Sequence, residues 1–123
     1  MIRLPSLAEL EKAARGADGR AFVWGEYFDW TFTIGGLSRK ELGFLRREGS
    51  RDVSVHGVRD LAGSVREWCS DDVPGRDFLR VVFGGGWGST VPDFFRCASW
   101  TLESAGAAST NHGFRVVREG DAE

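Results

Sequence analysis

Two carboxylates flank a glycine in the middle of the chain, and their spacing points to a site for a hard cation. Asp60 and Glu67 lie seven residues apart, with Gly63 between them. A backbone that turns at Gly63 would direct carbonyl oxygens into the space between the two carboxylates. Carboxylate and carbonyl oxygens are the ligands that Ca²⁺ takes in proteins. The spacing therefore predicts a calcium cage at this turn, and the alternative is a turn that salt bridges alone hold together.

Other residue types with catalytic or metal-binding potential are few and poorly spaced. His56 and His112 are the only histidines, and neither stands at a metal-ligand spacing from a cysteine or from the other histidine. The run Gly84–Gly88 is rich in glycine but lacks the lysine with which nucleotide-binding loops contact phosphate. We interpret these glycines as sites of close backbone packing, and we expect no transition-metal or nucleotide site.

The two cysteines, Cys69 and Cys97, are too few for a disulfide framework, although they leave open a single bridge. Cys97 follows the apolar pair Phe94-Phe95, which favours a buried and inert thiol over a nucleophile. The start of the chain has no apolar run of signal-peptide length. These features favour reduced thiols and a cytoplasmic protein, and export would need sequence outside this chain.

The elements that must position these residues begin with a helix. Ser6 stands three residues before Glu9, which is the spacing of a capping box, and Gly16 follows the last residue of the apolar pattern. These signals predict a helix over 7–15. The aromatic-rich stretch 22–32 is interpreted as core, and the polar stretch 35–54 as a surface excursion with a short helical turn near Lys40–Arg46.

The segment 80–118 combines two strand-like ends with a long irregular middle. The runs 78–83 and 114–117 are rich in β-branched and aromatic residues, which is typical of strands. Between them lie small residues and several aromatic ones, without helical periodicity or a run of charge. We predict a packed loop that presents a recognition surface, and the alternative is a glycine-rich connector between strands. Its aromatic residues are Trp87, Phe94, Phe95 and Trp100.

Length and charge exclude several classes of protein. A chain of 123 residues makes one domain, 1–123, and its five Trp and nine Phe supply large groups for a core. The net charge of −2 and the absence of a basic face argue against binding to nucleic acid or to anionic membranes. No apolar stretch reaches the roughly eighteen residues of a membrane span.

Five motifs, in order along the chain, resemble the formylglycine-generating enzyme family, also called the sulfatase-modifying factor family. The chain is similar to the C-terminal half of a full member. The resemblance implies the α+β fold that this family shares with C-type lectins, with short twisted strands, one clear N-terminal helix and much irregular structure. The motifs are RLPS and the helix that follows at 3–16, WG at 24–25, GVRDLAGSVREW at 57–68, GGGW at 84–87 and GFRVV at 113–117.

The resemblance also implies a structural calcium ion, because the family binds Ca²⁺ through the segment that matches 60–67. Carried over position by position, Asp60 and Glu67 would offer side chains, and Gly63 and Val65 would offer backbone carbonyls. Ser64 and Arg66 differ from the Asn and Trp that are commoner in the family, but these positions are not ligands.

The catalytic part of the family pattern is missing. Members that oxidise a sulfatase cysteine carry two reactive cysteines, which hold copper, shortly after the segment that matches Gly84–Gly86. The corresponding stretch here, 87–95, contains no cysteine, and Cys97 matches a position outside the reactive pair. The iron-dependent sulfoxide-synthase branch needs a set of histidines that His56 and His112 do not supply. We therefore expect neither copper nor iron, and no oxidase activity.

Two non-enzymatic uses of the family's fold fit this sequence. In bacteria, similar domains are fused to serine/threonine kinases, and the stretches 28–33 and 58–63 resemble that branch. Others are variable proteins of diversity-generating retroelements, in which Asn-type codons just before the Gly-Phe-Arg motif are mutated. Segment 83–112 fits such diversification because most of its unusual residues can arise from an Asn codon by changes at adenine. Trp100 and Glu103 cannot arise in this way.

We predict a catalytically inert module that binds a protein ligand and acts as a monomer or as part of a longer multidomain chain. Rigid aromatic side chains beside small polar residues supply contact area at a low cost in entropy. The alternatives are an oxidase of the formylglycine-generating type that needs a missing N-terminal half, and a structural regulatory domain of a kinase-like protein. The predicted contact residues are Phe83, Gly88, Ser89, Thr90, Val91, Phe94, Ser99, Trp100, Leu102, Glu103, Ser104 and His112.

Overall fold

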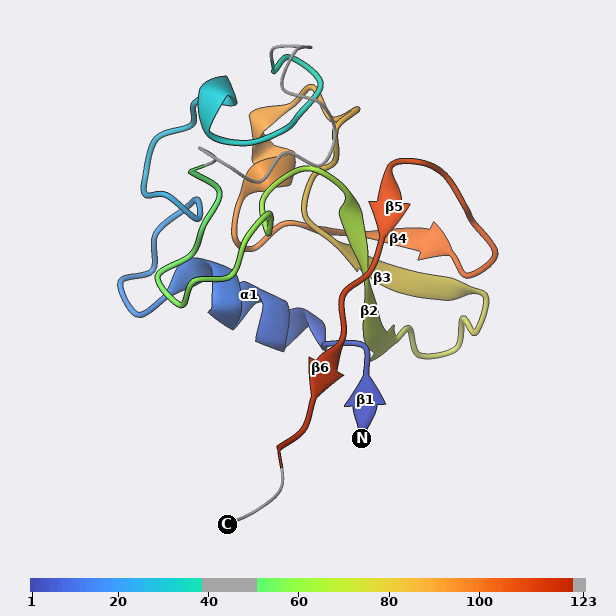
Figure 1. Cartoon of the computed structure of the whole chain (residues 1–123). Helices are drawn as coiled ribbons and strands as arrows, with labels where there is room; N and C mark the ends of the chain where they lie inside the picture. Colours follow the sequence, from blue (N-terminus) through green and yellow to red (C-terminus); the bar gives the residue numbers. More distant parts are fainter. Residues whose placement is uncertain (39–50, 121–123) are drawn as a thin grey trace.

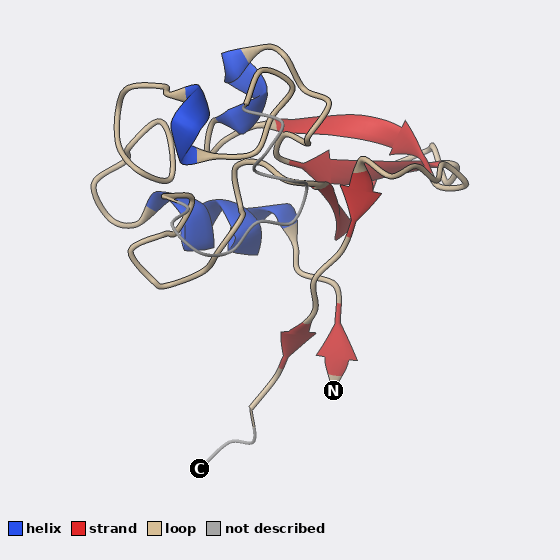
Figure 2. Ribbon diagram, turned by 45° about the horizontal axis from the view of Figure 1, so that its top comes forward, coloured by secondary structure: helices blue, strands red, loops and turns tan. Residues whose placement is uncertain are grey.

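The computed structural model describes residues 1–38 and 51–120. Helix α1 (Leu7–Arg15) lies beside a curled sheet, and irregular segments fill much of the remaining chain (Figure 1). Both ends of the chain leave the body side by side, through the antiparallel strands β1 (Ile2–Arg3) and β6 (Val117–Arg118) (Figure 2). The helical turn that we expected near Lys40–Arg46 lies outside the described residues. Within those residues, no helix has the length and apolar character that a membrane span requires.

Helix α1 has the bounds that its local signals predict. The Ser6 hydroxyl accepts a hydrogen bond from the Glu9 amide at 3.2 Å, and the Glu9 carboxylate accepts one from the Ser6 amide at 2.9 Å. This reciprocal pair satisfies two amides that have no partner within the helix. Gly16 ends the helix with a positive φ of 73°, which glycine adopts without strain. The capping box and the helix over 7–15 are therefore confirmed.

The main sheet has four strands in the order β4-β3-β2-β5. β2 pairs with β3 and β3 pairs with β4 in antiparallel fashion, whereas the short β5 pairs with β2 in parallel. The central strand β3 continues into the buried glycines at 84–86, and β4 lies at the border of the sheet (Figure 1). The strand bounds are β2 Arg66–Asp72, β3 Leu79–Phe83, β4 Trp100–Ser104 and β5 His112–Gly113.

The sequence predicted strands at 78–83 and 114–117 with a loop between them. The first strand is confirmed, whereas the loop and the second strand differ from the prediction. The run 78–83 becomes β3. The expected loop contains strand β4, whose alternating polar and apolar residues were masked by the surrounding glycines and serines. The expected strand over 114–117 is interrupted, because the chain leaves β5 at Gly113 and enters β6 only at Val117. The final segment thus connects two different sheets instead of extending one.

An aromatic cluster fills the space between the irregular segments and the sheet, as the stretch 22–32 predicts. The Phe95 ring is fully buried and contacts the rings of Phe28 and Trp30, with centroids 5.3 and 5.5 Å away. Distant glycines make room for it: a Cβ atom at Gly35 or at Gly85 would lie 2.5 or 2.8 Å from this ring. Close backbone packing, the role predicted for the glycines of the Gly84–Gly88 run, is confirmed at Gly85.

Candidate functional site

The turn that carries the predicted calcium residues is built around a buried carboxylate. The Asp52 carboxylate accepts hydrogen bonds from the amides of Ala62 and Gly63 and from the Thr33 hydroxyl, at 2.7–3.2 Å. Burial raises the pKa of Asp52, and these hydrogen bonds oppose the rise. The prediction that 35–54 is a surface excursion is wrong at Asp52, which is fully buried. Sequence reasoning missed this residue because an Asp in a polar stretch looks the same whether it is solvated or anchors a turn.

The same turn departs from ordinary backbone geometry. Asp60 and Ser64 are not glycines, yet they have positive φ angles of 59° and 74°. Such conformations persist where the surrounding structure holds them. The hydrogen bonds of Asp52 to the backbone between these two residues supply part of that support.

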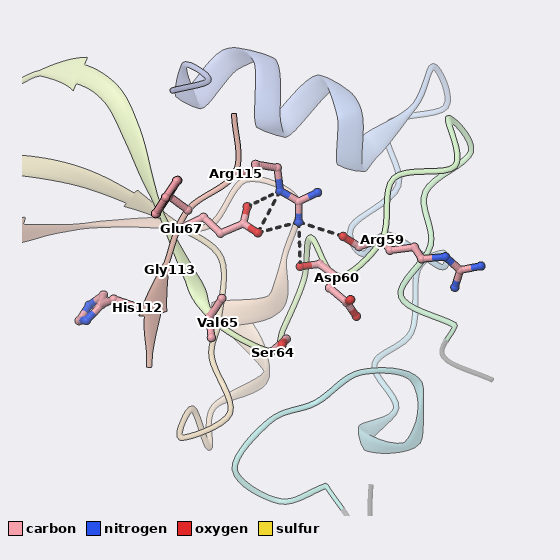
Figure 3. A pocket seen from close by; sticks show the side chains of 9 residues that line it. Arg59, Asp60, Ser64, Val65, Glu67, His112, Gly113 and Arg115 are labelled. Atoms are coloured by element: carbon pink, nitrogen blue, oxygen red, sulfur yellow. Dashed lines mark hydrogen bonds and ion pairs between the residues drawn. The ribbon is translucent and has the colours of Figure 1, made fainter. Parts of the chain in front are cut away.

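An arginine from the end of the chain fills the centre of the turn. The Arg115 guanidinium contacts the Glu67 carboxylate through Nε at 2.9 and 3.0 Å and through Nη2 at 2.6 Å (Figure 3). Nη2 also donates to the backbone carbonyls of Arg59 and Asp60, at 2.9 and 3.4 Å. The Glu67 side chain is only 6% exposed. Burial raises its pKa, and the guanidinium opposes that rise.

These contacts test whether the predicted donors fit a calcium ion. Both carboxylate oxygens of Glu67 already accept hydrogen bonds from Arg115. Asp60 turns its carbonyl, and not its carboxylate, toward that guanidinium (Figure 3). The Gly63 amide is directed to Asp52, and Val65 lines a pocket nearby. In the described part of the chain, no three acidic, histidine or cysteine side chains lie together as a metal site. As folded, Arg115 holds the Glu67 carboxylate that the predicted calcium ion would need, and the calcium site stays a prediction.

A pocket of about 550 Å³ opens beside the turn and reaches the end of β5. Phe114 is exposed at this pocket, whereas the Glu67 side chain at its inner wall is buried. The pocket therefore has two kinds of wall. Glu67 and Arg115 are charged and already pair with each other, whereas the Phe114 ring is exposed and available for contact. Its lining consists of Arg59, Asp60, Ser64, Val65, Glu67, His112, Gly113, Phe114 and Arg115 (Figure 3).

The structure separates the predicted contact residues by exposure. Phe83 is only 1% exposed, so its prediction as a contact residue is wrong: it lies in the central strand β3 and belongs to the core. The half-buried members are Ser89, Phe94, Ser99, Glu103 and His112. The exposed members are Gly88, Thr90, Val91, Trp100, Leu102 and Ser104.

Strand β4 further divides these residues between its two faces. Trp100 and Leu102 are 51% and 42% exposed and lie with Ser104 on one face, because alternate residues of a strand point the same way. Glu103 lies on the other face and pairs with Arg66 at 2.9 Å. The predicted residues therefore do not form one continuous patch.

Glu103 and His112 belong to a polar cluster with two residues that sequence reasoning missed, Arg66 and Trp68. The His112 ring stacks on Trp68 with centroids 5.4 Å apart, and its Nε2 atom lies 3.7 Å from the Glu103 carboxylate. Arg66 also contacts the Thr101 hydroxyl. Arg66 and Trp68 are two residues apart in β2, so a strand places them on the same face, and this spacing could have been read from the sequence. The sequence does not show that β5 would bring His112 beside them.

The family follows from comparison with known proteins. The model of the sulfatase-modifying factor enzyme 1-like domain matches residues 2–120, so the chain belongs to that family. The formylglycine-generating enzyme of Streptomyces coelicolor is 28% identical over 148 residues, which cover 97% of this chain and 47% of that enzyme. The serine/threonine-protein kinase Pkn1 of Chlamydia trachomatis is 31% identical over 139 residues, which cover 95% of this chain and 21% of the kinase. The chain thus spans half or less of the length of these relatives.

Solved structures confirm the fold. The protein described as CarF superposes with a TM-score of 0.73 at 26% identity, over 98% of this chain and 48% of that one. Treponema denticola variable protein 1 superposes with a TM-score of 0.68 at 24% identity, over 94% of this chain and 46% of that one. The resemblance to the formylglycine-generating enzyme family and its C-type-lectin-like α+β fold, stated from the sequence, is therefore confirmed.

Proposed function

We propose that this domain recognises a protein ligand through the surface of segment 83–112, and that it does not carry out the family's oxidation. The observation that carries the proposal is strand β4. It forms the border of the main sheet, and it displays Trp100 and Leu102 to solvent while the strand behind it is buried. A rigid base with exposed aromatic and aliphatic side chains is the usual form of a protein-binding surface.

The backbone of β4 adds to this surface. The Gly84 amide donates to the Ser99 carbonyl at 3.1 Å, which fixes the alternation of the antiparallel ladder. By that alternation, Thr101 and Glu103 bond to β3, and the amide groups of Trp100 and Leu102 point away from it. Backbone groups at the border of a sheet can pair with an extended segment of a partner. This geometry supports a protein over a small molecule as ligand.

The chemistry of the cysteines supports the lack of oxidase activity. Burial raises the pKa of Cys69 to about 12 and that of Cys97 to about 11. At neutral pH both groups are thiols, and the thiolate is the form that binds metal and attacks substrate. The segment 87–95, where the oxidising relatives hold their reactive pair, contains no cysteine.

Affinity capture with matched variants tests the recognition surface. The immobilised domain is compared with Trp100→Ala and with Tyr27→Ala, because Tyr27 is an aromatic residue that is 87% exposed outside segment 83–112. We expect a protein that the wild type and Tyr27→Ala retain and that Trp100→Ala loses. Equal retention by all three forms would contradict the proposed surface, provided that their circular dichroism spectra agree.

A peptide assay tests the lack of oxidation. The domain is incubated with copper and a cysteine-containing sulfatase peptide, and the peptide is analysed by mass spectrometry. We expect an unchanged mass. Loss of mass at the cysteine would show that the domain is an oxidase and would overturn this half of the proposal.

A second candidate function is a regulatory domain of a signalling protein. Three chlamydial Pkn1 kinases are 31% identical to this chain, and the similarity covers 21% of each kinase. A kinase domain in the same reading frame would favour this function. The retroelement hypothesis has a separate test: a near-copy of the coding region for 80–118, differing only at adenines and lying beside a reverse-transcriptase gene, would support it.

A further inference from the structure

The 59–67 turn presents an unusual concentration of oxygen atoms to one positive charge. The Arg115 guanidinium is contacted by the Glu67 carboxylate and by the carbonyls of Arg59 and Asp60. These are the same kinds of ligand, carboxylate and peptide carbonyl, that surround a hard cation in proteins. The cation in this turn is an organic one, supplied by the chain itself.

We propose that Arg115 is the resident cation of this turn and takes the place of a calcium ion, so that the domain folds and keeps its recognition surface without a metal. The guanidinium is suited to this role because it is planar, stays charged and donates from fixed positions. A divalent ion at the same oxygens would lie beside this positive charge, and the two would repel each other. The turn therefore has room for one cation or the other.

Backbone hydrogen bonds connect the 59–67 turn to residues 85–87, which lead into the exposed part of segment 83–112. The Gly85 amide donates to the Ala62 carbonyl at 2.9 Å, and the Trp87 amide donates to the Ser64 carbonyl at 2.7 Å. These bonds join the 59–67 turn to the backbone that enters the exposed loop at Gly88. Arg115 is thus a positioning residue: it holds the turn, and the turn holds the start of the loop.

Calcium titration of the intact chain tests the proposal directly. The melting temperature of the wild type is measured with millimolar Ca²⁺ and with the chelator EGTA, and Ca²⁺ binding is measured by isothermal titration calorimetry. We expect the same melting temperature in both solutions and no binding heat. A rise in melting temperature with Ca²⁺, together with a binding heat, would overturn the proposal.

The variant Arg115→Met removes the cation and keeps most of the apolar stem. In EGTA it should melt below the wild type, and Ca²⁺ should restore part of the loss, because the oxygens of Glu67, Arg59 and Asp60 then no longer face the guanidinium, and its charge no longer repels the metal. The control Arg118→Met removes an exposed arginine from β6 and should show neither effect. A melting temperature equal to that of the wild type in EGTA, or a loss that Ca²⁺ does not restore at all, would contradict the proposal.

A further variant covers the case in which Arg115→Met does not fold. In the double variant Glu67→Leu/Arg115→Met, both charges are replaced by apolar groups, which often restores stability at a buried ion pair. We expect this variant to fold and to be insensitive to Ca²⁺, because it lacks the Glu67 carboxylate that the proposal assigns to the metal once Arg115 is removed. Stabilisation of the double variant by Ca²⁺ would place the metal elsewhere and would overturn the assignment.

Discussion

The 59–67 turn and strand β4 are connected through the same sheet, but they use their side chains in opposite ways. Glu67 in the turn and Asp52 beneath it are buried, and their carboxylates accept hydrogen bonds from groups of this chain. In β4, Trp100 and Leu102 extend into solvent. The contrast indicates that polar groups of the turn serve stability, whereas apolar groups of β4 are available for contact with another molecule.

The largest expected effect lies in the core beneath both regions. Phe95→Ala removes a fully buried ring and leaves a cavity, so it should lower the free energy of unfolding by about 3–5 kcal/mol. The neighbouring variant Phe94→Ala should cost only about 1–2 kcal/mol, because Phe94 is half-buried. Urea unfolding followed by tryptophan fluorescence measures both. Equal losses would show that the 3-10 helix Pro92–Phe95 is packed on both sides.

The turn should be next in sensitivity. Glu67→Gln removes the negative charge opposite Arg115 and should cost about 3 kcal/mol, at the lower end of the range for breaking a buried ion pair. The lower value is expected because the Arg115 side chain remains 29% exposed. The matched variant Glu103→Gln breaks a pair with Arg66 in which the carboxylate is 28% exposed, against 6% for Glu67, and it should cost about 1 kcal/mol or less. Urea unfolding measures the loss of stability in both variants. A larger loss for Glu103→Gln than for Glu67→Gln would contradict the view that the polar groups of the turn serve stability more than those of β4.

Strand β4 should be nearly neutral for stability and decisive for binding. Trp100→Ala and Leu102→Ala should change the free energy of unfolding by no more than about 1 kcal/mol, as is usual for exposed positions. The affinity for the captured protein should fall about thirtyfold or more if these residues are central to the contact. Surface plasmon resonance measures the affinity, and thermal melting serves as the control. A large loss of stability without a loss of affinity would contradict the view that Trp100 and Leu102 serve binding and not stability.

The smallest effect concerns the exposed ion pair between Arg3 and Glu9. A hydrogen bond from Arg3 is the main reason that the pKa of Glu9 is lowered from 4.5 to about 2. A lowered pKa in the folded state adds stability that is present above about pH 4.5 and is lost as the pH falls toward 2. The stability difference between wild type and Glu9→Gln should therefore shrink over this range in urea titrations. A difference that stays constant with pH would show that the charge of Glu9 contributes nothing.

Local signals predicted much of the fold. The capping box of Ser6 and Glu9 specifies the start of α1 because both partners lie within four residues of each other. The β-branched residues at 81–82 mark β3, because such residues favour strands, and both are buried there. The family resemblance then supplied the overall fold, which no single motif would have established.

Long-range contacts account for what the sequence did not predict. Glu67 and Arg115 are separated by 48 residues, and nothing near either one shows that they pair. From the sequence alone, the carboxylates around Gly63 indicate ligands for a metal, and this stays a prediction. Phe83 was expected at the contact surface because it begins the segment that fits diversification, whereas β4 pairs along the edge of its strand. In each case the deciding partner was distant in sequence.

The pairing of β1 with β6 has a practical consequence for protein engineering. The Glu119 amide donates to the Met1 carbonyl at 3.1 Å, so the two ends of the described chain are adjacent. A domain with adjacent ends can be inserted into a surface loop of a host protein, or circularly permuted with a short linker, with little distortion. The strands project away from the main sheet (Figure 2). A host attached there would leave β4 accessible, which makes this domain a candidate scaffold for displaying selected contact residues.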